Sequence, residues 1–286
     1  MTSVTTEDAM GPLILGSGGQ IGTAFRTLWE RGAWPDCRRP LWHRRQGDDF
    51  SWDMLAGPAP RDPRLSLARG VIVLTGGVSG GTDPSQNTTL ACAAIELAKR
   101  EGLGPVLLCS SQAVYGRAEG PQGEGDTPHP VSAYGQAKLE MEAAVAGQDS
   151  LCCLRIGNVA GTDMLLRNAA LGPVKLDQFP DGRGPRRCYI GPKSLATTML
   201  SLIEAHLAGQ ILPNILNVSA PGERDMADLL TEAGAKWSWT PAPKAALPSL
   251  SLDLSLMNSI APLPKAAGSA QSLIAEARAA GWGLSA

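Results

Sequence analysis

A glycine-rich turn near the start of the chain restricts its fold more than any other stretch. The apolar run Leu13-Ile14-Leu15 leads into Gly16-Ser17-Gly18-Gly19-Gln20-Ile21-Gly22, and an amphipathic segment begins near Ile21. A strand, a glycine turn and a helix in this order form a unit that binds dinucleotides at the start of an α/β sheet. This stretch therefore predicts a dinucleotide-binding α/β fold.

Residues of this turn have expected roles in holding the cofactor. Gly16 permits the tight turn, Gly19 lets backbone amides approach a pyrophosphate, and Gly22 lets the helix pack on the strand. Gln20 and Ile21 open the helix, where unpaired N–H groups and the positive end of the helix dipole favour an anion. These five residues form the predicted pyrophosphate site.

The residues after the second predicted strand bear on the choice of cofactor. Pro40-Leu41-Trp42 fits this strand best and is followed by His43-Arg44-Arg45. An acidic residue here would bind the adenosine ribose of NAD, whereas arginines suit the 2′-phosphate of NADP. No acid stands there, so NADP is the predicted cofactor and NAD the alternative; a merely solvated basic turn would also explain Arg44 and Arg45. Asp53, in the run 50–54, is placed to meet the adenine amine.

The segments that follow alternate in the rhythm of a parallel sheet. Residues 70–78 form a continuous apolar run, a capped helix is expected over 83–100, and strands are expected over 105–109 and 151–156. Continuous apolar strands are typical of a sheet that is covered on both faces. The predicted fold class is α/β, a Rossmann-type doubly wound parallel sheet. Thr75, Gly76 and Gly77, at the exit of the run 70–78, leave room for the cofactor.

This rhythm breaks after about Gly161, which predicts two regions. Residues 11–161 are the predicted NAD(P)-binding Rossmann domain, and residues 162–286 are a smaller C-terminal substrate-binding lobe. Within the second region, residues 192–220 are expected to return to the Rossmann core as a helix over 192–207 and a strand over 215–218. Short helices are expected over 163–171, 226–233 and 269–280, and a loop over 240–248.

Tyr134 and Lys138 stand four residues apart in a segment that reads as helix. This spacing places both side chains on one helical face, one turn apart. An ammonium that close favours the phenolate and is expected to lower the pKa of the tyrosine from its usual value of about 10. Such a tyrosine can exchange a proton with an alcohol or a carbonyl at neutral pH.

Composition and charge exclude several other classes of protein. The formal net charge is -2, which gives no basic field for nucleic acid. The six cysteines show no Cys-x-x-Cys spacing and the three histidines are scattered, so no metal site is expected. The polar N-terminal residues do not read as a signal peptide, and no apolar run reaches the roughly 18 residues of a membrane span. A cytoplasmic protein is expected.

Several motifs resemble those of the extended short-chain dehydrogenase/reductases, a family of nucleotide-sugar epimerases, dehydratases and reductases. These motifs are the glycine turn, Ser110 to Gly116, His129 to Leu139 with Tyr134 and Lys138, and Leu154-Arg155 with Asn158-Val159. They occur in family order and cover residues 11–161 strongly and the rest weakly.

The resemblance implies roles for individual residues. Tyr134 would donate or accept the proton, Lys138 would hold the nicotinamide ribose and lower the pKa of the phenol, and Ser111 would hydrogen-bond the reacting oxygen. Asn87 matches a helix asparagine near the cofactor, and Arg187 an arginine that binds a substrate diphosphate. The implied substrate-binding residues are Ser111, Gln112, Asn158, Asn168 and Arg187.

Two departures from the family pattern bear on which reaction the protein is expected to catalyse. Family dehydratases carry an acidic pair directly after the position of Ser111, and this chain has Gln112-Ala113 instead. Gly191-Pro192-Lys193-Ser194 replaces the usual Val-x-Asp stretch. The predicted function is an NAD(P)-dependent oxidoreductase acting on a secondary alcohol or ketone, a class that includes nucleotide sugars. The alternatives are a nucleotide-sugar 4-epimerase and a non-catalytic NADP-sensing binding protein; a homodimer stays open.

Overall fold

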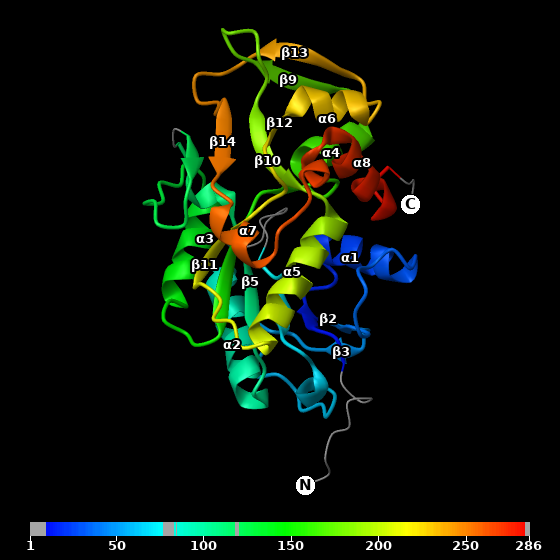
Figure 1. Cartoon of the computed structure of the whole chain (residues 1–286), viewed down its shortest axis with the longest axis vertical. Coiled ribbons are helices and arrows are strands. Elements are labelled where there is room, and N and C mark those ends of the chain that lie inside the picture. The colour runs from blue at the N-terminus through cyan, green and yellow to red at the C-terminus, as the bar shows by residue number, and fades with distance from the viewer. Residues whose placement is uncertain (1–9, 77–82, 84, 118–119, 284–286) are drawn as a thin grey trace.

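The large sheet consists of seven strands that all run parallel. The computed structural model describes residues 10–76, 83, 85–117 and 120–283. The strands of this sheet are β1 (Leu13–Leu15), β2 (Leu41–Arg44), β3 (Phe50–Ser51), β4 (Val71–Val73), β5 (Val106–Ser111), β7 (Leu151–Ile156) and β11 (Ile215–Val218). Their order is β11-β7-β5-β4-β1-β2-β3 (Figure 1). The predicted doubly wound parallel sheet is therefore confirmed.

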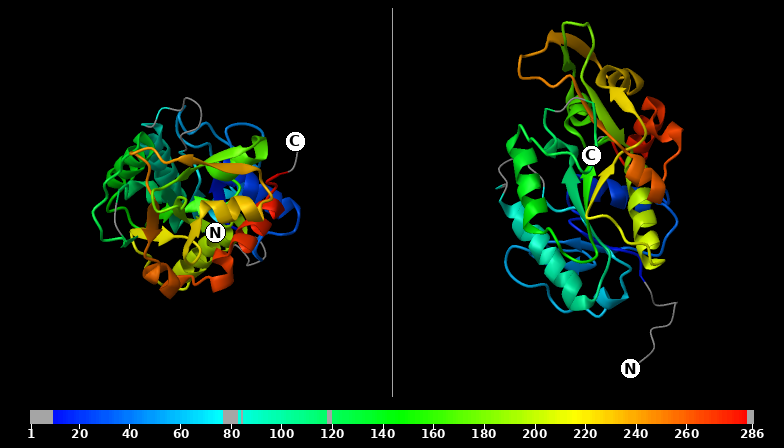
Figure 2. Two further views of the ribbon diagram at one scale, coloured as in Figure 1. Left: turned by 90° about the horizontal axis from the view of Figure 1, so that it is seen from above. Right: turned by 60° about the vertical axis from the view of Figure 1, so that its left-hand side comes forward.

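Four helices cover the two faces of this sheet. Helices α1 (Gln20–Glu30) and α5 (Pro192–Leu207) pack on one face, and α2 (Gln86–Glu101) and α3 (Ala133–Ala144) on the other. Neighbouring strand residues alternate between the faces: Ile14 packs with α1 and α5, whereas Leu13 and Leu15 pack with α2. The right-hand view of Figure 2 shows α2 and α3 on one side of the strands and α5 on the other. Burial on both faces explains why these strands are apolar runs without alternation.

The rest of the chain builds a lobe at the carboxyl ends of the parallel strands, above the sheet in Figure 1. A small mixed sheet has the order β12-β10-β14-β6, with β8 beside β10, and β13 pairs with β9. The strands of the lobe are β6 (Pro121–Gln122), β8 (Asn158–Val159), β9 (Val174–Gln178), β10 (Arg186–Ile190), β12 (Glu223–Asp225), β13 (Trp237–Pro241) and β14 (Ser249–Leu252). The helices of the lobe are α4 (Met164–Leu171), α6 (Met226–Glu232), α7 (Ser255–Ile260) and α8 (Ala270–Ala279). Short 3-10 helices occupy Leu65–Leu67 (η1), Gln112–Val114 (η2) and Lys265–Gly268 (η3).

The lobe has a hydrophobic core of its own between α4, α6 and α8. Leu166, Leu229 and Leu273 are fully buried there, together with Tyr189 of β10. The lobe is nevertheless continuous with the sheet, because β8 follows β7 directly and α5 follows β10.

The start of α5 is bound by a carboxylate from another helix, α8. Glu276 of α8 accepts hydrogen bonds from the backbone N–H (2.8 Å) and the hydroxyl (2.6 Å) of Ser194. A Cβ atom at Gly191 would lie 2.1 Å from the Glu276 Oε2 atom, so only glycine leaves space for this carboxylate. A carboxylate from α8 therefore binds the first turn of α5.

Some predicted elements have other bounds or were missed. Strand β2 extends through Arg44, so His43 and Arg44 lie in the strand instead of after it. Strand β5 includes Ser111. The predicted loop over 240–248 begins inside β13, which pairs with β9, a strand that was not predicted. Both strands of this pair carry exposed polar residues, so neither is a recognisable apolar run.

Candidate active site

Ser111 and Tyr134 meet where β5 ends against the start of α3. The Ser132 hydroxyl caps α3 by accepting the Gly135 N–H at 3.1 Å. A Cβ atom at Gly135 would lie 2.4 Å from the Ala113 carbonyl oxygen, so glycine allows the helix to approach the strand end closely. This approach brings the Tyr134 hydroxyl near the Ser111 hydroxyl.

Lys138 lies one turn further along α3 and is almost completely buried, with 2% exposure. Its ammonium donates to the Cys109 carbonyl of β5 at 2.8 Å. Burial lowers the pKa of Lys138 to about 8, although the Glu142 carboxylate opposes this effect. The structure therefore brings the three predicted catalytic residues, Ser111, Tyr134 and Lys138, to one strand end.

The predicted lowering of the Tyr134 pKa is wrong. Burial raises this pKa above its usual value, and the neighbouring Ser111 hydroxyl offsets only part of the effect. Desolvation disfavours the phenolate, and helical spacing alone does not reveal it. Tyr134 is consequently a protonated phenol at neutral pH.

Gly76 and Asn87 lie beside the Lys138 ammonium. A Cβ atom at Gly76, which has φ +89°, would lie 3.3 Å from the Lys138 Nζ atom and 2.3 Å from the Asn87 Oδ1 atom. Asn87 is 3% exposed. Its Nδ2 atom and the Thr75 Oγ1 atom are buried without a hydrogen-bond partner in the described part of the chain. Gly77, also predicted to bind the cofactor, lies outside the described residues.

The glycine turn has the geometry that its sequence predicts. Gly16 has φ +89°. A Cβ atom at Gly22 would lie 2.5 Å from the Ser17 Cα atom, so this glycine is needed for the helix to pack on the turn. A Cβ atom at Gly19 would contact only the Gly16 carbonyl, at 3.4 Å, among the described residues.

The Gln20 side chain contacts the lobe. In the amide orientation that satisfies both neighbours, its Nε2 atom donates to the Thr162 carbonyl (2.7 Å) and its Oε1 atom accepts from Arg167 (2.5 Å). Gln20 thus ties the glycine turn to α4 of the lobe. Ile21 is half-buried and packs against the hydrophobic core between α1 and α5.

His43 supports the glycine turn, a role that sequence reasoning missed. The Gly16 N–H donates to the His43 Nδ1 atom at 3.1 Å, and the Nε2 atom lies 2.8 Å from the Trp52 carbonyl. These partners require the neutral tautomer with its proton on Nε2. Burial accordingly lowers the pKa of His43.

These features fit a dinucleotide across the carboxyl ends of β1 and β4. The open glycine turn lies after β1, and the unpartnered polar atoms of Thr75 and Asn87 lie beyond the end of β4. Polar atoms buried without partners are costly, so their presence at one edge of the sheet favours a ligand that would satisfy them.

Arg44 and Arg45 differ in their surroundings. The Arg44 side chain lies along the glycine turn, where a Cβ atom at Gly18 would be 3.6 Å from its Nε atom. That Nε atom is 3.5 Å from the Asp48 carboxylate. Arg45 is largely exposed and pairs at 3.7 Å with Asp53, the residue predicted to meet the adenine.

Asp48 is an acidic residue that contacts the glycine turn, and its carboxylate already accepts hydrogen bonds from protein groups. It accepts from the Ser17 hydroxyl at 2.9 Å and from Arg26 at 2.5 Å, and its other oxygen accepts the Asp49 N–H at 3.0 Å. These hydrogen bonds hold the pKa of Asp48 below its usual value even though burial opposes them.

The predicted substrate-binding residues divide into three places. Gln112, in η2 directly after Ser111, donates to the Asn158 Oδ1 atom at 3.1 Å. Arg187 donates to the carbonyls of Arg186 and Leu247, both at 2.7 Å, and forms no salt bridge within the described residues. Burial lowers the pKa of Arg187.

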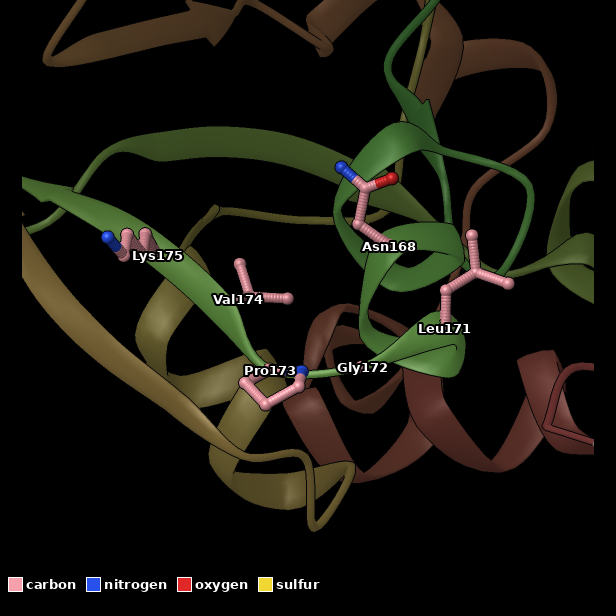
Figure 3. Close-up of a pocket in the computed structure, with 6 residues that line it drawn as sticks. All are labelled: Asn168, Leu171, Gly172, Pro173, Val174 and Lys175. Atoms are coloured by element: carbon pink, nitrogen blue, oxygen red, sulfur yellow. The ribbon is translucent and has the colours of Figure 1, made fainter.

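Asn168 lies in a separate cavity of about 380 Å³ between α4 and β9 (Figure 3). Figure 3 shows Asn168 and Leu171 on α4 and Val174 and Lys175 on β9. Neither Ser111, Tyr134 nor Lys138 lines this cavity.

Within the described ranges, no group of three or more histidine, cysteine or acidic side chains is arranged to hold a metal ion. No helix in the same ranges is long and apolar enough to cross a membrane.

Solved structures similar to this chain include enzymes that act on nucleotide sugars. A UDP-glucose 4-epimerase from Brucella ovis in complex with NAD is 21% identical, with a TM-score of 0.75 over 97% of this chain and 99% of that chain. TunA, an NAD-dependent NDP-hexosamine 5,6-dehydratase, is 18% identical, with a TM-score of 0.68 over 94% and 97% of the chains. The UDP-glucose-4-epimerase of Stenotrophomonas maltophila, with bound NAD and formylated UDP-arabinopyranose, is 19% identical, with a TM-score of 0.69 over 94% and 96%.

The fold is thus that of the Rossmann-type nucleotide-sugar epimerases and dehydratases. Residues 78–173, which carry Ser111, Tyr134 and Lys138, match the NAD dependent epimerase/dehydratase family. No curated protein sequence matches the chain. The predicted resemblance to the extended short-chain dehydrogenase/reductases is confirmed.

Proposed function

We propose that this protein is an NAD(P)-dependent oxidoreductase that transfers hydride to or from a secondary alcohol or ketone. The observation that carries this proposal is the constellation at the end of β5, where the Tyr134 hydroxyl lies near Ser111 and buried Lys138 lies one turn along α3. A phenol and a hydroxyl that meet at one point can both donate to a single substrate oxygen.

Each of these residues has a distinct task. The nicotinamide cofactor, when bound, supplies or accepts the hydride. Ser111 and Tyr134 polarise the substrate carbonyl, and Tyr134 transfers the proton of its hydroxyl. Lys138, with Asn87 and Thr75, would hold the cofactor's nicotinamide end. The phenol of Tyr134 is protonated at neutral pH and can donate its proton, which suits reduction of a ketone.

A nucleotide sugar is the proposed substrate class. Arg187 is a mostly buried cation without a carboxylate partner among the described residues, which suits a diphosphate. The similar enzymes include a UDP-glucose 4-epimerase, so 4-epimerisation by the same residues is the second candidate function. Gln112 replaces the first acid of the dehydratase pair, which argues against loss of water. A dinucleotide-sensing protein without turnover is the remaining alternative.

We propose NADP as the preferred cofactor. Asp48 is occupied by Ser17 and Arg26, so it is poorly available to a ribose hydroxyl, whereas Arg44 lies along the turn. A partly exposed guanidinium contact to a phosphate would favour NADPH about ten- to hundred-fold. Arg44→Ala is expected to remove most of this preference, and added salt should erode it. Equal or tighter binding of NADH by the wild type would contradict the proposal.

A cytoplasmic location is part of the proposal. All six cysteines are free, as is usual in a reducing compartment. A homodimer stays a prediction that sedimentation can test.

Tyr134→Phe tests the proposed chemistry. Wild-type protein is mixed with NADPH and a panel of ketones, or with NADP+ and a panel of UDP-sugars, and absorbance at 340 nm is followed. The variant keeps the ring packing and loses only the transferable proton, so kcat should fall at least 100-fold while NADPH affinity changes little. Gln136→Ala, on the exposed face of the same helix, serves as the control. Near-wild-type turnover by Tyr134→Phe would refute the proposed role.

A further inference from the structure

A buried ion pair lies next to the catalytic candidates. Glu142 and Arg155 are 6% and 2% exposed. The Arg155 Nη2 atom donates to the Glu142 Oε2 atom at 2.8 Å, and the Arg155 Nε atom lies 3.2 Å from both carboxylate oxygens. Such bidentate geometry fixes both side chains.

The pair joins the elements that carry the catalytic candidates. Glu142 lies on α3, one turn after Lys138, and Arg155 lies on β7 opposite Ser110 of β5. The Ser110 hydroxyl donates to the Glu142 Oε1 atom. Ser110 directly precedes Ser111, so one carboxylate ties the helix of Lys138 to the strand that ends in Ser111.

Arg155 extends this connection to the neighbouring strand. Its guanidinium lies over the Tyr115 ring, 4.8 Å from the centroid. The Tyr115 hydroxyl donates to the Asn217 Oδ1 atom of β11 at 2.7 Å, and the Asn217 Nδ2 atom donates to the Gln122 carbonyl of β6 at 2.8 Å. A polar network therefore crosses from the catalytic helix to the base of the lobe.

Stability alone does not account for a buried ion pair, because desolvation of the two charges offsets much of their attraction. Hydrophobic residues of similar size would often serve the core as well. We propose that Glu142 is a positioning residue for the proposed oxidoreductase site: through Ser110 and Arg155 it fixes Lys138 relative to Ser111 and balances the charge of the buried ammonium.

The electrostatics agree with this role. Burial is the main influence on Lys138 and lowers its pKa to about 8, while the Glu142 carboxylate on α3 acts in the opposite direction. The thiols of Cys109 on β5 and Cys153 on β7 also lie near this ammonium, but burial raises the pKa of both to about 12, so neither carries charge near neutral pH. Glu142 is therefore the negative group of this cluster, and it faces both the Lys138 ammonium and the Arg155 guanidinium.

Three variants separate charge from position. Glu142→Gln keeps the length of the side chain and removes its charge. Glu142→Asp keeps the charge and shortens the side chain by one methylene. Glu140→Gln is the matched control, since Glu140 lies on the exposed face of α3. Among the described residues, its side chain accepts a hydrogen bond from Gln136. Lysine ε-carbon NMR of the cofactor-free protein gives the pKa of Lys138, whose signal Lys138→Met assigns, and NADPH fluorescence gives the affinity.

Glu142→Gln is expected to lower the Lys138 pKa by about one unit, and Glu140→Gln to leave it unchanged. Glu142→Asp should keep this pKa near its wild-type value and weaken NADPH binding at least three-fold. An unchanged Lys138 pKa in Glu142→Gln, or unchanged NADPH affinity in Glu142→Asp, would overturn the proposal.

If the Glu142 variants do not fold, Ser110→Ala carries the test. It removes one hydrogen bond from Glu142 and leaves both charges in place. NADPH affinity is expected to fall about three-fold with little change in Tm, and unchanged affinity would overturn the proposal. Because the Lys138 pKa is measured without cofactor, failure of the wild type to bind NADPH would refute the proposed function separately.

Discussion

Gly19→Val should abolish dinucleotide binding without unfolding the protein. Gly19 is the N-cap of α1 and has φ -75° and ψ 176°, a conformation that valine adopts easily. A Cβ atom there would contact only the Gly16 carbonyl, at 3.4 Å, in the described structure. Valine is a poorer N-cap than glycine, which costs about 1 kcal/mol, or about 2 °C in Tm for a chain of this size. The branched side chain would occupy the space over the turn that a pyrophosphate needs.

Thermal unfolding with and without NADPH measures both effects. At a concentration 100 times Kd, a ligand stabilises the folded state by about 2.7 kcal/mol, which corresponds to a rise in Tm of about 5 °C. The wild type should show this rise and Gly19→Val should show none. A full ligand-induced rise in Gly19→Val would refute the reasoning and place the cofactor elsewhere.

Gly22→Ala is the contrasting variant. Its new Cβ atom would lie 2.5 Å from the Ser17 Cα atom and 2.6 Å from the Gly16 carbonyl oxygen. Backbone must move to relieve this overlap, so this variant should lose about 1–3 kcal/mol of stability even without ligand. If Gly22→Ala had the same Tm as the wild type, the conclusion that α1 packs closely on the turn would be wrong.

Three further variants test the surroundings of the site. Glu276→Ala should lower the free energy of unfolding by about 2 kcal/mol in urea titrations, because both hydrogen bonds to Ser194 are lost; an unchanged midpoint would contradict the capping role. His43 has a lowered pKa, so its contribution to stability is present above about pH 6.5 and is lost as pH falls below that value. The difference in stability between wild type and His43→Gln should therefore be constant from about pH 6.5 to 8 and shrink below about pH 6.5. Thr75→Val should raise the Tm of the free protein and weaken NADPH binding, since the buried Thr75 hydroxyl has no partner among the described residues; tighter NADPH binding would argue against a cofactor contact.

The elements that the sequence predicted best are those with strong local signals. Helix α5 spans Pro192–Leu207 and β11 spans Ile215–Val218, as expected, because Pro192 opens the helix and Ile215–Val218 is a short isolated strand signal. Strands β9 and β13 pair with each other although more than fifty residues of sequence separate them. Because both carry polar side chains, neither has the continuous apolar run by which the other strands were predicted.

The part of the site that depends on the spacing of residues along the chain could be predicted from the sequence. Tyr134 and Lys138 are one helical turn apart, and Ser111 follows an apolar strand, so their meeting could be expected. The direction of the Tyr134 pKa depends on burial, which spacing does not report. His43 and Glu142 act through contacts with segments that are distant in the sequence, Gly16 and Arg155. No local sequence pattern predicts these contacts.

The path of residues 192–218 has a consequence for synthesis on the ribosome. Chain up to residue 161 emerges with β7 as a bare edge strand and with Leu107 and Leu154 uncovered, because α5 and β11 have not yet been made. Folding of the first region therefore waits for translation of about sixty more residues, most of which belong to the lobe. Nascent chains stalled where β7 has left the exit tunnel but β11 has not should bind chaperones strongly, and those stalled far enough beyond residue 218 for β11 to have left the tunnel should bind them less.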